Sequence, residues 1–130
     1  MMERIAQELS LLRTRFPDLE YQEAGQWVLI PSFPVSKGWN RTTTAVAYQI
    51  PVGYPGTPPY SFFVPAGILF GDVRPNNYTE PASNQPLFAG TWGAFSWSHT
   101  EEWRATADLL TGSNLLHWTF GFAQRFADGV

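Results

Sequence analysis

The stretch Tyr54-Pro55-Gly56-Thr57-Pro58-Pro59 decides the fold of this chain, because it places three prolines and a glycine within six residues. Each proline fixes the backbone angle φ and removes a hydrogen-bond donor, so the stretch cannot continue a helix or a central strand. Pro and Gly are also the residues that turns favour. We therefore expect a stiff corner that joins two strands.

Strand patterns flank this corner. In Thr42–Ile50, the residues Thr44, Val46, Tyr48 and Ile50 alternate with smaller or polar residues, which is typical of a strand with one buried face. Three further segments are candidates for strands: Gln26–Phe33, Tyr60–Val64 and, as a short one, Ile68–Phe70. The links between them are short, and parallel pairing needs long crossovers. The pattern predicts an antiparallel meander of about four strands.

The N-terminal segment is predicted to form a helix over residues 2–16. Its apolar residues recur at helical spacing, and its polar residues, Glu8 among them, are expected on the solvent face. The apolar positions are Ile5, Leu9, Leu12 and Phe16.

The C-terminal part is predicted to be helical as well. Ser98–Glu101 fits a capping box, which indicates a helix that includes Thr106–Leu110. Ser113 or Asn114 can cap a further helix. One apolar stripe marks that helix: Leu115, Trp118, Phe122 and Phe126. The fold class is thus α+β, with an N-terminal helix, the meander and C-terminal helices packed on the sheet, in a single domain spanning 1–130.

Composition narrows the classes of function. The chain is 44% hydrophobic and 15% charged, which excludes a disordered chain. A net charge of −3 with scattered basic residues argues against nucleic-acid partners. No stretch approaches the roughly 20 apolar residues of a membrane span, and the start of the chain has no signal-type apolar core. We expect a cytoplasmic protein with no membrane partner.

The chain has no cysteine, which excludes disulfides, thiolate metal sites and cysteine nucleophiles together. His99, Glu101 and Glu102 offer metal-binding atoms, but a site needs three or four converging ligands. Phosphate-cradling glycine motifs are absent too. We therefore expect no metal and no cofactor.

Residues 71–91 are rich in Pro, Asn, Gly and Ser and predict a long loop, and loops of this length in a small domain are often functional. Four aromatic residues follow at Trp92, Phe95, Trp97 and Trp103. Core packing is one interpretation of these residues. A binding surface is the other, because tryptophan is enriched at the energetic centres of protein interfaces.

Two motif blocks carry a resemblance to a known family. The corner Tyr54–Pro59 is similar to the Y-P-x-x-x-P signature of ubiquitin-conjugating (UBC-like) domains and, more distantly, of RWD domains. Trp92-Gly93-Ala94-Phe95-Ser96-Trp97-Ser98-His99, with the later Trp103-Arg104 and Asp108-Leu109, resembles the bacterial branch of that superfamily called family E. The order of the predicted elements also agrees with the UBC-like fold.

The chain departs from the family pattern at the residue that carries the modifier. Ubiquitin-conjugating enzymes carry their modifier as a thioester on a cysteine, and by this resemblance the counterpart of that cysteine falls near Phe95, within 93–97, where no thiol stands. Arg74-Pro75-Asn76 is similar to the family's His-Pro-Asn motif, with arginine in place of histidine. The resemblance then implies that Asn76 corresponds to the residue that supports the oxyanion. Thioester-type conjugating activity is not expected.

The resemblance implies a cysteine-less member of a bacterial ubiquitin-like modification system, which binds a ubiquitin-like protein, its activating enzyme, or both. The surface expected for this binding comprises Asn76, Trp92, Phe95, Trp97 and Trp103. One alternative is an unconventional transferase that uses Ser96, Ser98 or His99. Another is an interaction module of RWD type that is unrelated to ubiquitin.

Overall fold

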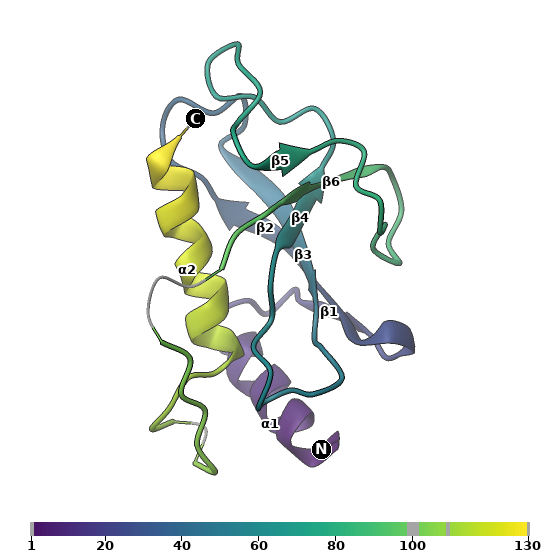
Figure 1. Ribbon diagram of the computed structural model, residues 1–130, viewed down its shortest axis with the longest axis vertical. Helices are drawn as coiled ribbons and strands as arrows, with labels where there is room; N and C mark the ends of the chain where they lie inside the picture. Colours follow the sequence, from purple (N-terminus) through teal and green to yellow (C-terminus); the bar gives the residue numbers. More distant parts are fainter. Residues whose placement is uncertain (1, 99–101, 109, 130) are drawn as a thin grey trace.

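The computed structural model describes residues 2–98, 102–108 and 110–129. Figure 1 shows a twisted sheet with one helix along its face and a second helix at its lower end. The elements, in chain order, are α1 (Met2–Arg13), β1 (Glu20–Gln22), a 3-10 turn η1 (Ala24–Gln26), β2 (Trp27–Pro34), β3 (Thr43–Gln49), β4 (Phe62–Pro65), β5 (Tyr78–Thr79), β6 (Trp92–Phe95) and α2 (Leu115–Asp128).

The described part of the chain forms a six-stranded sheet in the order β1-β2-β3-β4-β6-β5, and every strand pair is antiparallel. This confirms the α+β class and the meander, while the strand count is larger than predicted. The strands that the sequence did not reveal are β1, β5 and β6. The first two have only three and two residues, and β6 contains Gly93 and Ala94, which have low strand propensity.

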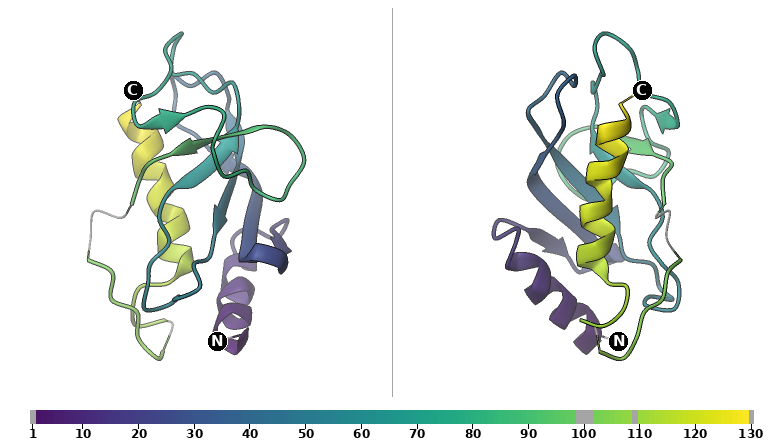
Figure 2. Two further views of the ribbon diagram at one scale, coloured as in Figure 1. Left: turned by 45° about the vertical axis from the view of Figure 1, so that its right-hand side comes forward. Right: turned by 90° about the vertical axis from the view of Figure 1, so that its left-hand side faces the viewer.

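α2 lies along one face of the sheet, and α1 packs beside the start of α2 at the lower end, as Figures 1 and 2 show. Alternation along β3 directs Val46 and Tyr48 to this face, and the α2 stripe packs against them. The rings of Phe62 on β4 and Phe122 on α2 stack with their centroids 4.2 Å apart. The predicted stripe Leu115, Trp118, Phe122 and Phe126 is entirely buried. This helix face is the main hydrophobic core.

The opposite face of the sheet is covered by the long loop. Trp27, Ala47 and Phe63 from the strands form a second cluster with Ala82 and Trp92, and Phe88 packs against it. The predicted loop 71–91 is therefore partly a structural cover, since its apolar residues shield the outer face of the sheet.

The helix boundaries differ from those predicted. The first helix ends at Arg13 instead of Phe16, because the backbone N–H of Thr14 bonds the carbonyl of Leu11 in a tighter turn. Ile68–Phe70 is not a strand, although Phe70 forms isolated bridges with Trp39 and Val73.

The helix predicted over Thr106–Leu110 is wrong for the residues that the structure describes there, which form bends and a turn. The predicted capping box lies mostly outside the described residues, since 99–101 are among the exceptions. Asn114 does cap α2, and its side-chain oxygen accepts from the backbone N–H of His117 at 2.9 Å. Neither α1 nor α2 is long and apolar enough to cross a bilayer.

Candidate functional site

The proline corner is tied to both helices through a buried carboxylate. Tyr54 at the corner is completely buried, and its hydroxyl lies 2.7 and 2.6 Å from the two carboxylate oxygens of Glu8 on α1. Burial, and then the hydrogen bond to Glu8, raises the pKa of the Tyr54 phenol far above its ordinary value. The phenol therefore stays protonated and donates to Glu8.

Glu8 has two more partners. Its carboxylate accepts from Arg4 Nε at 2.6 Å and from the backbone N–H of Leu115, also at 2.6 Å. Leu115 is the first residue of α2, where backbone donors lack helical partners and favour an anion. One side chain thus joins α1, the corner and the start of α2.

The expectation that Glu8 faces solvent is wrong, because its side chain is only 1% exposed. A signal was present in the sequence: Glu8 lies three residues after Ile5 and four before Leu12, so it neighbours both residues at the border of the apolar arc of the helix. An acidic residue at such a position requires a buried partner.

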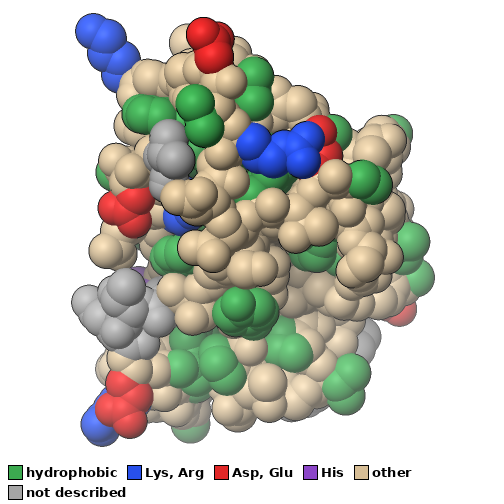
Figure 3. Space-filling view, turned by 45° about the horizontal axis from the view of Figure 1, so that its top comes forward, with side chains coloured by type: hydrophobic (Ala, Val, Ile, Leu, Met, Phe, Trp, Pro, Cys, Tyr) green, Lys and Arg blue, Asp and Glu red, His purple; other side chains and the backbone are tan. Residues whose placement is uncertain are grey.

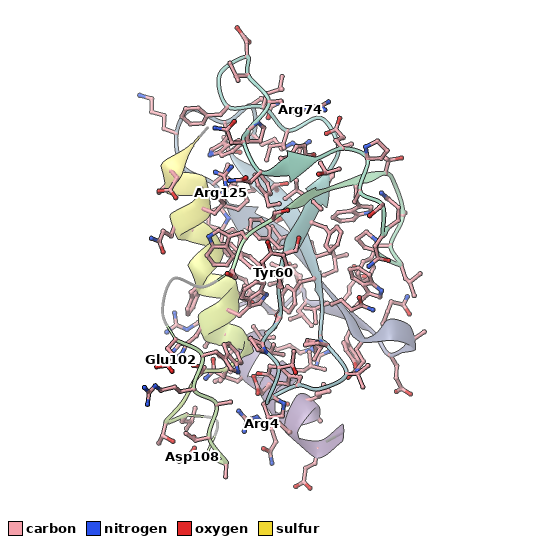
Figure 4. All side chains as sticks on the ribbon, viewed as in Figure 1. Arg4, Tyr60, Arg74, Glu102, Asp108 and Arg125 are labelled. Carbon is pink, nitrogen blue, oxygen red and sulfur yellow. The ribbon has the colours of Figure 1, made fainter. Side chains whose placement is uncertain are left out.

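Trp103 lies at the same end of the molecule. Its indole N–H donates to the carbonyl of Pro55 at 2.8 Å, and its ring centroid is 5.9 Å from that of Tyr54. Arg4 Nη1 bonds the carbonyl of Thr106 at 2.5 Å, so the corner and the segment before α2 are held together. Figure 4 shows Arg4, Glu102 and Asp108 at this end.

Grooves open beside this junction. A groove of about 430 Å³ is lined by Arg4, Pro55, Trp103 and Thr106, among others. Another, of about 460 Å³, lies between Leu11 on α1 and the exposed Leu110. These hollows contain both apolar and charged groups and are large enough to receive side chains of a partner.

By the resemblance to the family, the counterpart of the cysteine falls near Phe95, and this residue lies in the core. Phe95 on β6 is fully buried, with its ring centroid 5.0 Å from that of Phe62. The exposed hydroxyls nearest in sequence are Ser96 and Ser98. The backbone N–H of Ser96 donates to the carbonyl of Asn77 at 2.8 Å, which brings Ser96 beside the Asn76–Asn77 turn. His99 lies outside the described residues.

Asn76 is exposed and is held in place from below by Arg125 of α2. Arg125 Nη2 donates to the carbonyl of Asn76 at 2.9 Å, and Nη1 donates to that of Gly129 at 2.6 Å. The guanidinium carbon lies 4.7 Å from the centre of the Phe95 ring. Burial lowers the pKa of Arg125, yet an arginine remains charged at neutral pH. No pattern in the sequence points to Arg125, since an isolated arginine in a helix carries no signal of its own.

The other aromatic residues lie at separate places. Trp92 is 3% exposed within the cluster on the outer face of the sheet. Trp97 is partly buried, with its ring centroid 5.1 Å from that of Trp118. The structure therefore brings Asn76 and Ser96 together at the β5–β6 edge, whereas Trp103 lies at the corner. In this segment a partner can reach the serines more easily than Trp92 or Phe95.

A polar cluster fixes the short strand β5. Glu80 accepts from the backbone N–H of Gly67 at 2.8 Å and from the Tyr78 hydroxyl at 2.7 Å, and Arg74 approaches it at 3.4 Å. The Gly67 bond, followed by the Tyr78 bond, lowers the pKa of Glu80. Burial and the bond to Glu80 raise the pKa of Tyr78. The charged groups of Glu80 and Arg74 thus hold the loop in place. Within residues 2–98, 102–108 and 110–129, no group of His, Asp or Glu side chains is arranged to bind a metal.

The helix, the antiparallel sheet, the proline corner and the C-terminal helix together define the class of UBC-like proteins. A family profile described as prokaryotic E2 family E matches residues 7–119, so the chain belongs to that family. No curated protein and no solved structure gives a match to this chain. Membership connects the chain with ubiquitin-like pathways in general, and the absence of cysteine separates it from thioester-forming enzymes.

Proposed function

We propose that this chain is a non-covalent binding component of a bacterial ubiquitin-like modification system, which recognises a ubiquitin-like protein, its activating enzyme, or both. The observation that carries the proposal is membership of an E2 family by a chain without cysteine. Without a thiol the domain has no thioester to form, while its shape still offers surfaces for the partners of that pathway.

The surface proposed for the modifier is the β5–β6 edge. Asn76 and Ser96 are exposed there, and Ser98 is exposed two residues beyond Ser96. The turn is held by the Arg125 side chain, which donates to the carbonyl of Asn76, and by the backbone N–H of Ser96, which donates to the carbonyl of Asn77. A rigid surface loses little conformational entropy on binding. Figure 3 shows that charged side chains are few on the face it displays, with polar and hydrophobic groups between them. Such a surface suits a protein partner better than a polyanion.

Calorimetric titration against the ubiquitin-like protein and activating enzyme encoded beside this chain tests the proposal. We expect saturable binding to at least one of them. Ser96→Arg should weaken this binding at least tenfold, because it adds a long charged side chain at the proposed surface. Ser32→Arg is the matched control, since Ser32 is exposed on β2 away from this edge.

Two results would count against the proposal. Absence of binding to either protein at high micromolar concentration would leave an RWD-type module unrelated to ubiquitin as the better interpretation. Equal weakening by the two arginine variants would show that the β5–β6 edge is not the surface used.

A second candidate function is that of an unconventional transferase. The exposure of Ser96 beside the Asn76–Asn77 turn favours it, because a hydroxyl near the oxyanion-supporting position of the family could accept an acyl group as an ester. Ser98, two residues further along the chain, is exposed as well. Incubation with activating enzyme, ATP and modifier should then give an adduct that survives thiol but not hydroxylamine. Ser96→Ala or Ser98→Ala should abolish it, and an unmodified mass under active conditions would exclude this candidate.

A further inference from the structure

Lys37 is the only lysine in the chain, and the other basic residues among the eight are arginines. In a ubiquitin-like pathway this difference matters, because a lysine amine can accept an acyl group and form a stable amide. An arginine guanidinium stays protonated in proteins and does not serve as such an acceptor. Apart from an α-amino group at the start of the chain, Lys37 is therefore the one amine that a modifier could be attached to.

The backbone around Lys37 is firmly anchored. The residue lies in the connection between β2 and β3, at the end of the molecule where α2 terminates (Figures 1 and 2). Ser36 Oγ and Trp39 Nε1 both donate to the carbonyl of Phe126, at 2.8 and 2.9 Å. Gly38 has φ of 113°, and a Cβ there would come within 2.4 Å of the Phe70 ring, so only glycine fits. The connection thus presents Lys37 at a defined place.

The Lys37 side chain itself is exposed and unengaged. Its ammonium forms no hydrogen bond and no ion pair with the part of the chain that the structure describes. The guanidinium groups of Arg41 and Arg125, in contrast, are bonded to backbone carbonyls. An unengaged lysine on a rigid loop is free to approach an acyl donor without breaking internal contacts.

We propose that Lys37 is a modification site, at which this chain accepts the carboxyl terminus of the ubiquitin-like protein that it binds. The inference rests on the proposed function. A domain without a thiol cannot pass the modifier on, but when it docks beside the loaded activating enzyme it holds an amine at high effective concentration near the activated acyl group.

The chemistry balances with the components of such a pathway. The activating enzyme uses ATP to form an acyl adenylate of the modifier, which releases pyrophosphate, and then a thioester on its own cysteine, which releases AMP. The Lys37 ammonium releases a proton to solvent, and the neutral amine attacks the thioester carbonyl. A C–N bond forms and the C–S bond breaks. The attacking nitrogen then loses a second proton, which the leaving thiolate takes up. The product is an amide, which resists both thiol and hydroxylamine.

Intact-mass analysis and peptide mapping test the inference, with the full chain incubated with activating enzyme, ubiquitin-like protein and ATP. We expect an adduct that survives hydroxylamine and maps to Lys37. Lys37→Arg should reduce the adduct at least tenfold, and its affinity in the titration should stay unchanged. The matched control combines Lys37→Arg with Arg13→Lys, which moves the single lysine to an exposed position on α1. This double variant should remain unmodified.

The outcomes separate this inference from the proposed function. Binding in the titration without any adduct, although the activating enzyme is loaded, would overturn Lys37 as the site and leave the proposed function standing. An adduct confined to a serine or the α-amino group, or equal modification of the relocated lysine, would also overturn it. Failure of binding itself would overturn both.

Discussion

Glu8 connects more of the molecule than any feature of its local sequence indicates. Its carboxylate holds the Tyr54 hydroxyl, the Arg4 guanidinium and the first amide of α2, all within 2.7 Å. A buried charge is tolerated only when it is paired and hydrogen-bonded, and Glu8 satisfies both conditions. The residue thereby makes the position of the proline corner depend on both helices.

Replacement of Glu8 by glutamine should lower the free energy of unfolding by about 2–4 kcal/mol. The NH2 group of the glutamine would face groups that are themselves hydrogen-bond donors, and Arg4 would lose its counter-charge. Urea denaturation followed by tryptophan fluorescence measures this loss. Glu3→Gln, on an exposed position of the same helix, should change stability by less than about 0.5 kcal/mol. A Glu8→Gln protein as stable as the parent would show that the carboxylate is not needed.

Glu80 should make the stability of the protein depend on pH. Its pKa is lower in the folded state, so its contribution is complete above its ordinary pKa and disappears as the pH falls through the folded-state pKa. Between about pH 5 and pH 3, the parent should therefore lose more stability than Glu80→Gln does. Urea denaturation at a series of pH values measures the two slopes. Glu20→Gln, on an exposed carboxylate, should keep the parent slope, and identical slopes for all three proteins would contradict the assignment.

At the scale of elements, the pairing of β5 with β6 depends on Gly93, which has no side chain to fill the space beside Tyr78. Tyr78 pairs with Phe95, and its hydroxyl end lies over Gly93, where an added Cβ would collide with the tyrosine hydroxyl oxygen. The ring of Tyr78 also packs 4.9 Å from that of Phe95. The short strand is thus held by one close approach and by the bonds to Glu80, and the Asn76–Ser96 surface rests on this arrangement.

Gly93→Ala should lower the free energy of unfolding by about 1–3 kcal/mol, because the new methyl group displaces Tyr78. In the double variant with Tyr78→Ala the loss should be smaller than the sum of the two single losses by at least about 1 kcal/mol, since the clash no longer exists. Denaturation of the four proteins gives this coupling. Strictly additive losses would show that the two residues do not meet.

The same edge can be tested for its orientation towards an activated modifier. Ser96→Cys places a thiol at the exposed position next to the buried Phe95. If the edge faces the loaded activating enzyme, this variant should gain a thiol-sensitive adduct, visible on a non-reducing gel and absent after reduction. Ser32→Cys is the control and should gain none. A Ser96→Cys protein that stays unmodified beside a loaded activating enzyme would place the acyl donor elsewhere.

At the scale of the whole molecule, the helix-facing core extends from α1 through the sheet to α2. It contains Leu12, Tyr48, Phe62 and Phe126, each fully buried, so no separate core is visible in either half of the described chain. We therefore predict cooperative unfolding, with coincident transitions by far-ultraviolet circular dichroism and tryptophan fluorescence. Two separated transitions would contradict a single domain.

Local patterns predicted the long elements of this fold well. The alternation in Thr42–Ile50 and the stripe from Leu115 to Phe126 are strong, and both were confirmed. The short strands β1 and β5 could not be predicted, because two or three residues carry no measurable period and each strand is defined only by its pairing with a longer one. The helix predicted at Thr106–Leu110 was wrong for the described residues of that segment, where Arg4 bonds the carbonyl of Thr106 and the Thr106 hydroxyl bonds the carbonyl of Asp108.

The sequence by itself determined that this protein has a meander with a proline corner between two helical ends, and that the chain has no cysteine with which to form a disulfide or a thioester. Periodicity, proline geometry and the absence of cysteine act locally, so they can be read residue by residue. Only the tertiary structure decided which groups bind Glu8, that Arg125 supports Asn76, and that Trp92 and Phe95 pack inside while Ser96 and Lys37 remain exposed. Those assignments depend on which distant side chains meet, because burial and hydrogen bonding are properties of the packed chain and not of its local pattern.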